Sequence, residues 1–358
     1  MTPFTARDLT RTVGEAVAAL REVADRDWSR PAAGLEWSCH DTAVHLAGDL
    51  TAFAAQLAAR APASWLPVRL DVAPGTTPGP LTDLVEASGR VLAATVLAAR
   101  PDDRAWHPAG AAGADGFAAM GAAEVLLHTH DILHGLGATG WTGWTGCAHT
   151  SALVLDRLFP HAPRPAGADA WDALLAATGR ADLPGLPRRR HWRWYADPVR
   201  GTGVVLCEVS PSAAADLHTG GPGGFVWAED GPPEGTRIAA GMLGLAREVG
   251  EYHPGWGPYV IVREADRRAI GGIGFHGAPD PEGRAEIGYD LLPSARGRGH
   301  ATEALRALAG WAFSQPGPTA LLAVVDAGNA PSHAVVRRAG FERDTCVDGA
   351  VRYLLRRP

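Results

Sequence analysis

The residues that most clearly favour chemistry are the arginines and glycines of a short turn, Arg296 to Ala301. The turn follows an apolar stretch at 286–292 and precedes a stretch in which Ala301, Leu305 and Leu308 recur at helical spacing. A turn that opens a helix presents unpaired backbone N–H groups and the positive end of the helix dipole. Glycine lets the backbone approach a ligand closely, and arginine binds phosphate oxygens. We therefore expect a phosphate or pyrophosphate to bind at Arg296, Gly297, Arg298, Gly299, His300 and Ala301.

A second group of reactive side chains lies in the first half of the chain. Glu124 and His128 are four residues apart, so they share one face of a predicted helix, and His45 lies in the middle of another. Two histidines and a glutamate from two helices can hold a divalent metal such as zinc, with one position open for water or a thiol. An ordinary ion pair between Glu124 and His128 is the simpler alternative, and spacing alone leaves both open.

The elements that position these groups change in period along the chain. The first half predicts four helices of an all-α, up-and-down bundle, at 7–24, 40–60, 81–100 and 117–136. The second half predicts strands at 204–209, 259–264, 269–276, 285–292, 319–326 and 351–356. Helices are expected between them at 236–249, 302–313 and 332–339. The change of period predicts two domains, residues 1–198 and residues 199–358.

The second half resembles a known superfamily. The pattern Arg-x-x-Gly-x-Ala after a strand resembles the coenzyme A motif of the GNAT acetyltransferases, and the segment from Asn329 to Phe341 looks like the next element of that fold. The resemblance implies an α+β domain with a central mixed sheet, acetyl-CoA as cofactor, and an acetyltransferase. The acceptor would be a primary amine of a small molecule or of a protein N-terminus, attacked directly in a ternary complex.

Acetyl transfer needs a group that polarises the thioester and a base that takes a proton from the amine. We expect the backbone N–H of Leu291 or Leu292 to polarise the carbonyl. Glu286 is the favoured base, with a cross-strand pair to an arginine as the equal alternative. His276 and Asp290 are the reserve candidates for the base.

The remaining acetyl-transfer residues follow from the same resemblance. Ser332 matches a serine near the cofactor sulfur and is the expected acid; the N-cap of the last helix is its alternative role, and one serine can fill both. Asn329 is expected to hydrogen-bond the pantetheine arm. The segment before the 236–249 helix usually borders the acceptor site in this fold, where four of its side chains would suit a cationic amine: Trp227, Glu229, Asp230 and Glu234.

The first half resembles another family. The segments Leu35–Asp49 and Glu124–Gly137 are similar to the metal segments of the DinB-like, mycothiol-dependent maleylpyruvate isomerases. The resemblance implies His45, Glu124 and His128 as the ligands of zinc or another divalent metal, with Asp131 orienting His128. It also implies a metal- and mycothiol-dependent transferase or isomerase; a non-catalytic substrate-binding bundle is the alternative.

This half departs from the pattern of the family that it resembles at His130, which stands where a tryptophan is usual, and His134 adds a further imidazole. Either histidine could rearrange the ligation or line the pocket.

Composition restricts the partners and the compartment. A net charge of −6 argues against nucleic-acid binding, despite the interleaved arginine and tryptophan of 188–194. No apolar run approaches the length of a membrane span, and the first residues lack the apolar core of a signal peptide. The 4 cysteines are scattered without a C-x-x-C pair, which is typical of reduced thiols. We therefore expect a cytoplasmic protein without nucleic-acid or membrane partners.

Overall fold

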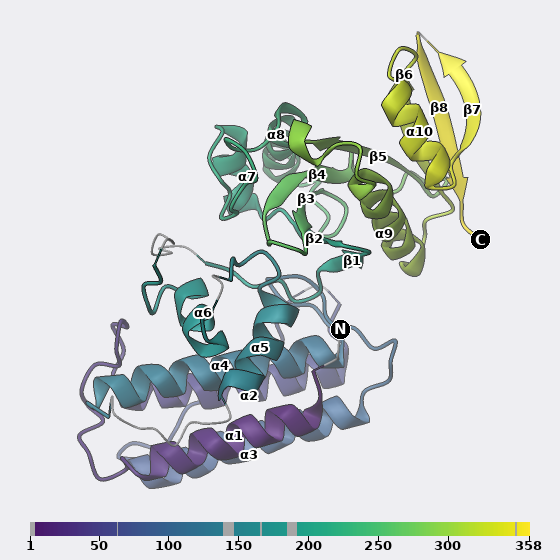
Figure 1. Cartoon of the computed structure of the whole chain (residues 1–358). Coiled ribbons are helices and arrows are strands. Elements are labelled where there is room, and N and C mark those ends of the chain that lie inside the picture. The colour runs from purple at the N-terminus through teal and green to yellow at the C-terminus, as the bar shows by residue number, and fades with distance from the viewer. Residues whose placement is uncertain (1–3, 63, 139–146, 165–166, 185–191, 348) are drawn as a thin grey trace. The chain divides into compact units, whose positions relative to one another are not determined.

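The computed structural model describes residues 4–62, 64–138, 147–164, 167–184, 192–347 and 349–358, so Arg188 to His191 lie outside the described residues. The chain divides into two compact units (Figure 1). The first comprises residues 1–159 and 165–197, and the second comprises residues 160–164 and 198–358. No described helix is long and apolar enough to cross a membrane.

The first unit is a helical bundle. Its four long helices are α1 (Ala6–Arg21), α2 (Cys39–Ala59), α3 (Pro78–Ala98) and α4 (Ala114–Gly135), with α5 (Cys147–Leu158) and α6 (Ala170–Ala177) following. Helices α1 and α2 each pack against α3 and α4, and α5 packs against α4. Thr5 and Ser38 cap α1 and α2 through their side chains. Helix α4 is buried along most of its length, so its polar residues are held inside the bundle.

The second unit is an eight-stranded mixed sheet with helices on both faces. Its strands are β1 (Val199–Gly201), β2 (Val204–Glu208), β3 (Pro258–Arg263), β4 (Ala269–Phe275), β5 (Arg284–Leu291), β6 (Ala320–Asp326), β7 (Glu342–Val347) and β8 (Ala350–Arg356). Their order in the sheet is β1-β2-β3-β4-β5-β6-β8-β7. The helices are α7 (Pro211–His218), α8 (Glu234–Glu248), α9 (His300–Ser314) and α10 (Ala330–Arg338).

Alternation along β5 decides which side chains meet which helix. Asp290 contacts Thr236 at the start of α8, whereas Ile287 and Leu291 belong to the buried core that includes Leu305 of α9. Helices α8 and α9 therefore cover opposite faces of the sheet. Side chains from both faces of the sheet can contact a ligand that lies between two strands.

The feature that opens the sheet lies between β5 and β6, its one parallel pair among the described strands. The two strands pair only where Arg284–Glu286 meets Ala320–Leu322. Beyond these residues they separate, and β5 runs into the turn before α9 while β6 runs into α10. The separation leaves the edge of β5 that faces β6 without a partner strand.

The predicted fold class, a helical bundle followed by a GNAT-like mixed sheet, is confirmed. Strands β1 and β7 and helix α7 were not predicted. Helix α7 is short, although Ser210 caps it and Pro211 stands at its first position. Strand β7 consists mainly of polar and charged residues, which do not alternate as in a half-buried strand.

Candidate functional site

The predicted phosphate turn has the geometry of an anion site. Gly297 and Gly299 have φ of 73° and 85°, a left-handed conformation that other residues adopt at a cost. Gly299 is the N-cap of α9 and has no side chain to bond the first N–H groups of the helix. These donors border a groove of about 500 Å³. The groove is lined by five of the six predicted residues, Arg296, Gly297, Gly299, His300 and Ala301; Arg298 is not among its lining residues.

Two side chains complete the groove. The Nε of Arg296 donates to the carbonyl of Leu291 at 3.1 Å, which fixes the guanidinium beside the turn. The hydroxyl of Thr302, in the first turn of α9, is buried without a hydrogen-bond partner and borders the groove. Thr302 was missed by sequence reasoning, although a threonine directly after the glycine turn is a signal for a further oxygen ligand. A phosphate here would accept from both groups and from the helix N-terminus.

The open edge of β5 offers backbone donors to whatever fills the gap. The N–H of Leu292 donates to the carbonyl of Ile270 at 2.9 Å, so it is already used within the sheet. Because hydrogen-bonding direction alternates along an antiparallel strand, the N–H groups of Leu291 and Tyr289 point away from β4 and toward the gap. Of the two residues predicted to polarise the thioester, only Leu291 has its backbone N–H directed toward the gap. Tyr289 offers a second such N–H.

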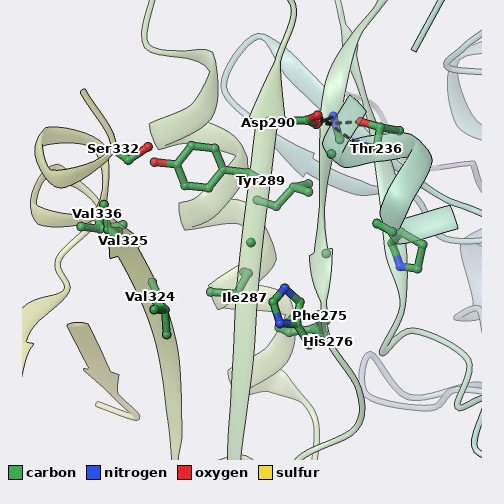
Figure 2. A pocket seen from close by; sticks show the side chains of 18 of the residues that line it. Thr236, Phe275, His276, Ile287, Tyr289, Asp290, Val324, Val325, Ser332 and Val336 are labelled. Carbon is green, nitrogen blue, oxygen red and sulfur yellow. Dashed lines mark hydrogen bonds between the residues drawn. The ribbon is translucent and has the colours of Figure 1, made fainter. Parts of the chain in front are cut away.

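A second cavity, of about 350 Å³, lies on the α8 side of the gap (Figure 2). Its walls come from β3, β4, β5, β6, the first two turns of α8 and helix α10. The cavity and the groove share four lining residues: Tyr289, Asp290, Asn329 and Ser332. The two spaces therefore meet where β5 and α10 face one another.

Tyr289 and Ser332 stand at this junction. Figure 2 shows the two hydroxyl groups directed toward each other. The phenol oxygen of Tyr289 is buried without a hydrogen bond of standard geometry. Burial raises the pKa of Tyr289, and the nearby Ser332 hydroxyl opposes this only in part. Sequence reasoning had missed Tyr289; its signal was a tyrosine on the strand leading into the phosphate turn.

The start of α10 corrects one alternative role. The Oδ1 of Asn329 accepts from the backbone N–H of Ser332 at 3.2 Å, so Asn329 is the N-cap of α10. The alternative that Ser332 caps this helix is therefore wrong. The cap leaves the Ser332 hydroxyl on the cavity wall, as an acid would require.

The three candidates for the base lie on the α8 face. Glu286 pairs with His276, whose Nδ1 is 3.1 Å from Oε1, rather than with an arginine. His276 lines the cavity, whereas Glu286 is not among its lining residues. Asp290 accepts from the N–H and hydroxyl of Thr236, at 2.9 and 2.7 Å, and from the N–H of Gly272 at 3.1 Å. These three bonds occupy its carboxylate in holding α8 against the sheet.

The segment expected to border the acceptor places none of its predicted aromatic or acidic side chains on the cavity wall. None of Trp227, Glu229, Asp230 and Glu234 is among the residues lining the cavity, which α8 reaches with Gly235, Thr236 and Ala239. Glu229 instead accepts from the backbone N–H of Ser294 at 2.7 Å, next to the phosphate turn. Hydrogen bonding from Ser294 lowers the pKa of Glu229.

The predicted metal residues of the first unit come together. One ligand atom from each of His45, Glu124 and His128 lies within 4.8 Å of the others. Ligands on a tetrahedral zinc are roughly 3.4 Å apart, so small side-chain rotations would close the set. The Nε2 of His128 is already 2.9 Å from Glu124, and its Nδ1 is 3.4 Å from Asp131. The donor set and its spacing fit a divalent metal with an open position.

Neighbouring carboxylates contact the two imidazoles of this cluster. Burial lowers the pKa of His128, but hydrogen bonds to Asp131 and Glu124 outweigh it and raise that pKa to about 9. Asp131 is itself clamped by two bonds from Arg180, at 2.9 and 2.7 Å. The Nε2 of His45 is 3.1 Å from Asp49.

The two extra imidazoles are outside the cluster. His130 and His134 contact each other, with ring centroids 5.8 Å apart, and His130 also contacts Trp171. Among the described residues, neither belongs to the metal-ligating group.

Two family models match separate parts of the chain. Residues 227–342 match the acetyltransferase (GNAT) domain, and residues 9–133 match the mycothiol maleylpyruvate isomerase N-terminal domain. The uncharacterized N-acetyltransferase YoaA of Bacillus subtilis is 34% identical over 89 residues, 25% of this chain and 49% of that protein. The uncharacterized N-acetyltransferase YjdG of the same organism is 32% identical over 87 residues, 24% of this chain and 52% of that protein.

The chain thus spans about half the length of the curated relatives it matches. A GNAT-family acetyltransferase structure from Bacillus anthracis aligns at 18% identity with a TM-score of 0.33, over 45% of this chain and 98% of that one. Both resemblances expected from the sequence are confirmed: the second half carries a GNAT acetyltransferase domain, and the first half resembles the N-terminal domain of the mycothiol-dependent maleylpyruvate isomerases.

Proposed function

We propose that the second unit transfers the acetyl group of acetyl-CoA to a primary amine of a small molecule or a protein N-terminus. The observation that carries this proposal is the meeting of two cavities at the gap between β5 and β6. One cavity contains the phosphate turn with Arg296. The other has no arginine among its described lining residues, and its carboxylates are Asp326 and Asp290, of which Asp290 also lines the first. Such a division suits a polyanionic cofactor on one side and a cationic amine on the other.

The geometry supports a direct transfer. The phosphate turn would hold the pyrophosphate, and the pantetheine arm would run along the open edge of β5. An extended pantetheine arm is longer than the distance from the phosphate turn to Leu291. The thioester carbonyl would therefore lie farther along β5 and accept from the N–H of Tyr289, the next one that faces the gap. The thiolate that leaves would receive its proton at the hydroxyl pair of Tyr289 and Ser332. We place the reaction in the cytoplasm, which supplies acetyl-CoA.

The test is release of free coenzyme A thiol, with a panel of small amines and short peptides as acceptors. The full chain is expected to bind acetyl-CoA in calorimetry and to release thiol only when an amine is present. Arg296→Glu places a carboxylate at the phosphate turn and is expected to abolish both. A wild-type chain that binds no acetyl-CoA would refute the proposal.

A second candidate function rests on the cluster of His45, Glu124 and His128. We propose that these residues hold zinc or another divalent metal, which when bound would lower the pKa of a coordinated thiol such as mycothiol. Asp131 would keep the ring of His128 turned toward the metal, with Arg180 fixing Asp131 in turn. The bundle would then be a thiol-dependent transferase or isomerase rather than a substrate-binding module.

Elemental mass spectrometry on untagged protein tests this second candidate. We expect about one zinc per chain in the wild type and its loss in His45→Ala, with Asp41→Asn on the same helix as the matched control. Metal that stays in His45→Ala, or is absent from both proteins, would leave the bundle as a binding module.

A further inference from the structure

Glu286 and His276 are separate candidates for the base, but their side chains contact each other. The two residues are neighbours across β4 and β5, because the N–H of His276 donates to the carbonyl of Glu286 at 3.0 Å. The carboxylate of Glu286 meets Nδ1 of the imidazole at 3.1 Å. A proton on Nδ1 would face this carboxylate, so the contact favours the tautomer that carries its lone pair on Nε2.

The other nitrogen of the imidazole, Nε2, lies over Gly288 of β5. A Cβ atom built on Gly288 would lie 3.1 Å from the Nε2 of His276, so the ring extends over this glycine. Gly288 directly precedes Tyr289, whose N–H faces the gap. The imidazole lines the acceptor cavity (Figure 2). Glu286 is not among the lining residues. Any side chain at position 288 would crowd the ring.

We infer that His276 takes the proton from the acceptor amine and that Glu286 is a positioning residue which acts through it. The inference rests on the proposed acetyl transfer and assigns its base. The contact at Nδ1 holds the ring over Gly288 and stabilises the imidazolium once Nε2 is protonated.

The step balances in atoms and charge. Nε2 of His276 takes one proton from the ammonium, and the freed amine attacks the thioester carbonyl. The carbon–nitrogen bond forms and the carbon–sulfur bond breaks, with its electron pair leaving on sulfur. The second proton lost from nitrogen ends on the thiolate through the hydroxyls of Tyr289 and Ser332. The first leaves for solvent from His276, whose side chain is 63% exposed.

The other titratable groups around this ring are accounted for. Asp290 shares the strand face but is held by the three donors from Thr236 and Gly272. Asp326 lines the same cavity from the end of β6, and Tyr259 lines it from β3. The hydroxyl of Tyr259 donates to the carbonyl of Gly255 at 2.8 Å. Glu286 is thus the carboxylate that contacts the imidazole.

The experiment compares His276→Gln, Glu286→Gln and the double variant in the full chain, over about pH 6 to pH 10. His276→Gln is expected to lower kcat/KM by about 10²–10⁴-fold and to abolish the acid limb of the profile. Glu286→Gln is expected to lower kcat/KM by about tenfold, because the imidazole loses the carboxylate that holds its ring in place. The double variant should be no slower than His276→Gln.

Two controls test whether Glu286 acts through the imidazole. Glu282→Gln removes an exposed carboxylate that pairs with Arg284 at 3.1 Å just before β5, and should leave the profile unchanged. Added imidazole should restore activity to His276→Ala. If Glu286→Gln is the slower variant and His276→Gln keeps the acid limb, Glu286 is itself the base and the inference is overturned. All variants should bind acetyl-CoA as the wild type does; failure of the wild type to bind it would instead refute the acetyl transfer.

Discussion

Removing the carboxylate of Asp290 should detach the start of α8 from the sheet. This carboxylate accepts from the N–H and the hydroxyl of Thr236 and from the N–H of Gly272, although Thr236 is 54 residues away in sequence. Helix α8 has no side-chain cap of its own, since its N-cap is Pro233. Asp290 therefore acts as a cap supplied from the neighbouring strand.

The magnitude follows from these three bonds. A hydrogen bond to a charged group contributes about 1.5–3 kcal/mol, and a buried donor left unpaired costs about 1–3 kcal/mol. In Asp290→Ala the donors of Thr236 and Gly272 lose their partner, partly compensated by water at the cavity wall. We expect the free energy for opening the first turns of α8 to fall by about 3 kcal/mol. Asp290→Asn keeps one oxygen but turns an amide N–H₂ toward a donor, and should cost about 2 kcal/mol.

Hydrogen exchange read by mass spectrometry on peptides from 234–248 measures this opening directly. The KM for the amine should rise, because Gly235, Thr236 and Ala239 form one wall of the acceptor cavity. The control is Asp326→Asn, which removes a carboxylate from the same cavity and should change exchange by less than about 0.5 kcal/mol. Unchanged exchange across α8 in Asp290→Ala would refute the reasoning.

Three further predictions concern other sites. Tyr289→Phe should lower kcat about tenfold or more with little change in the Kd for acetyl-CoA, because the lost phenol acts only on the leaving thiolate; stopped-flow thiol release and calorimetry separate the two quantities. Hydrogen bonds raise the pKa of His128 from 6.5 to about 9, so in the metal-free chain the stability that this histidine contributes should be fully present below about pH 6.5 and be lost as the pH rises through about 9. Urea denaturation across this range should show the loss, and a flat profile would contradict it; Glu124→Gln should weaken the dependence. Burial raises the pKa of the Cys39 thiol to about 11, so iodoacetamide should modify the exposed Cys346 and spare Cys39 in mass spectra of the native chain.

Sequence patterns predicted the long elements well because burial imposes a period on them. The helices of the bundle and strands β5, β6 and β8 carry apolar residues at the spacing of a buried face, whereas β3 and β4 are short apolar runs buried on both faces. The ends of all these elements lie near the predicted ones. Short or polar elements lack that signal. Helix α7 is only 8 residues long, and the residues of β7 follow no alternation. The domain boundary near residue 198 stays a prediction.

Some residues of the candidate site could likewise be predicted from the sequence, and others could not. The phosphate turn could be predicted because its glycines and arginines are consecutive in the chain. The pairing of Glu286 with His276 could not, since it depends on the register between β4 and β5. Register also decides that the N–H of Leu292 is used within the sheet while that of Leu291 faces the gap. The orphaned hydroxyls of Tyr289 and Thr302 become visible only once their neighbours are known.

The separation of β5 and β6 has a mechanical consequence for the second unit. Among the described strands, the pairing of Arg284–Glu286 with Ala320–Leu322 is the only one that joins the block β1–β5 to the block β6–β8. A pantetheine chain in the gap would offer its amide groups where a strand would otherwise offer peptide groups, and so would complete the interrupted ladder. The cofactor would then serve as a seam between two half-sheets. Binding of the cofactor would stiffen the unit. Its dissociation would let the two blocks move apart and release free coenzyme A.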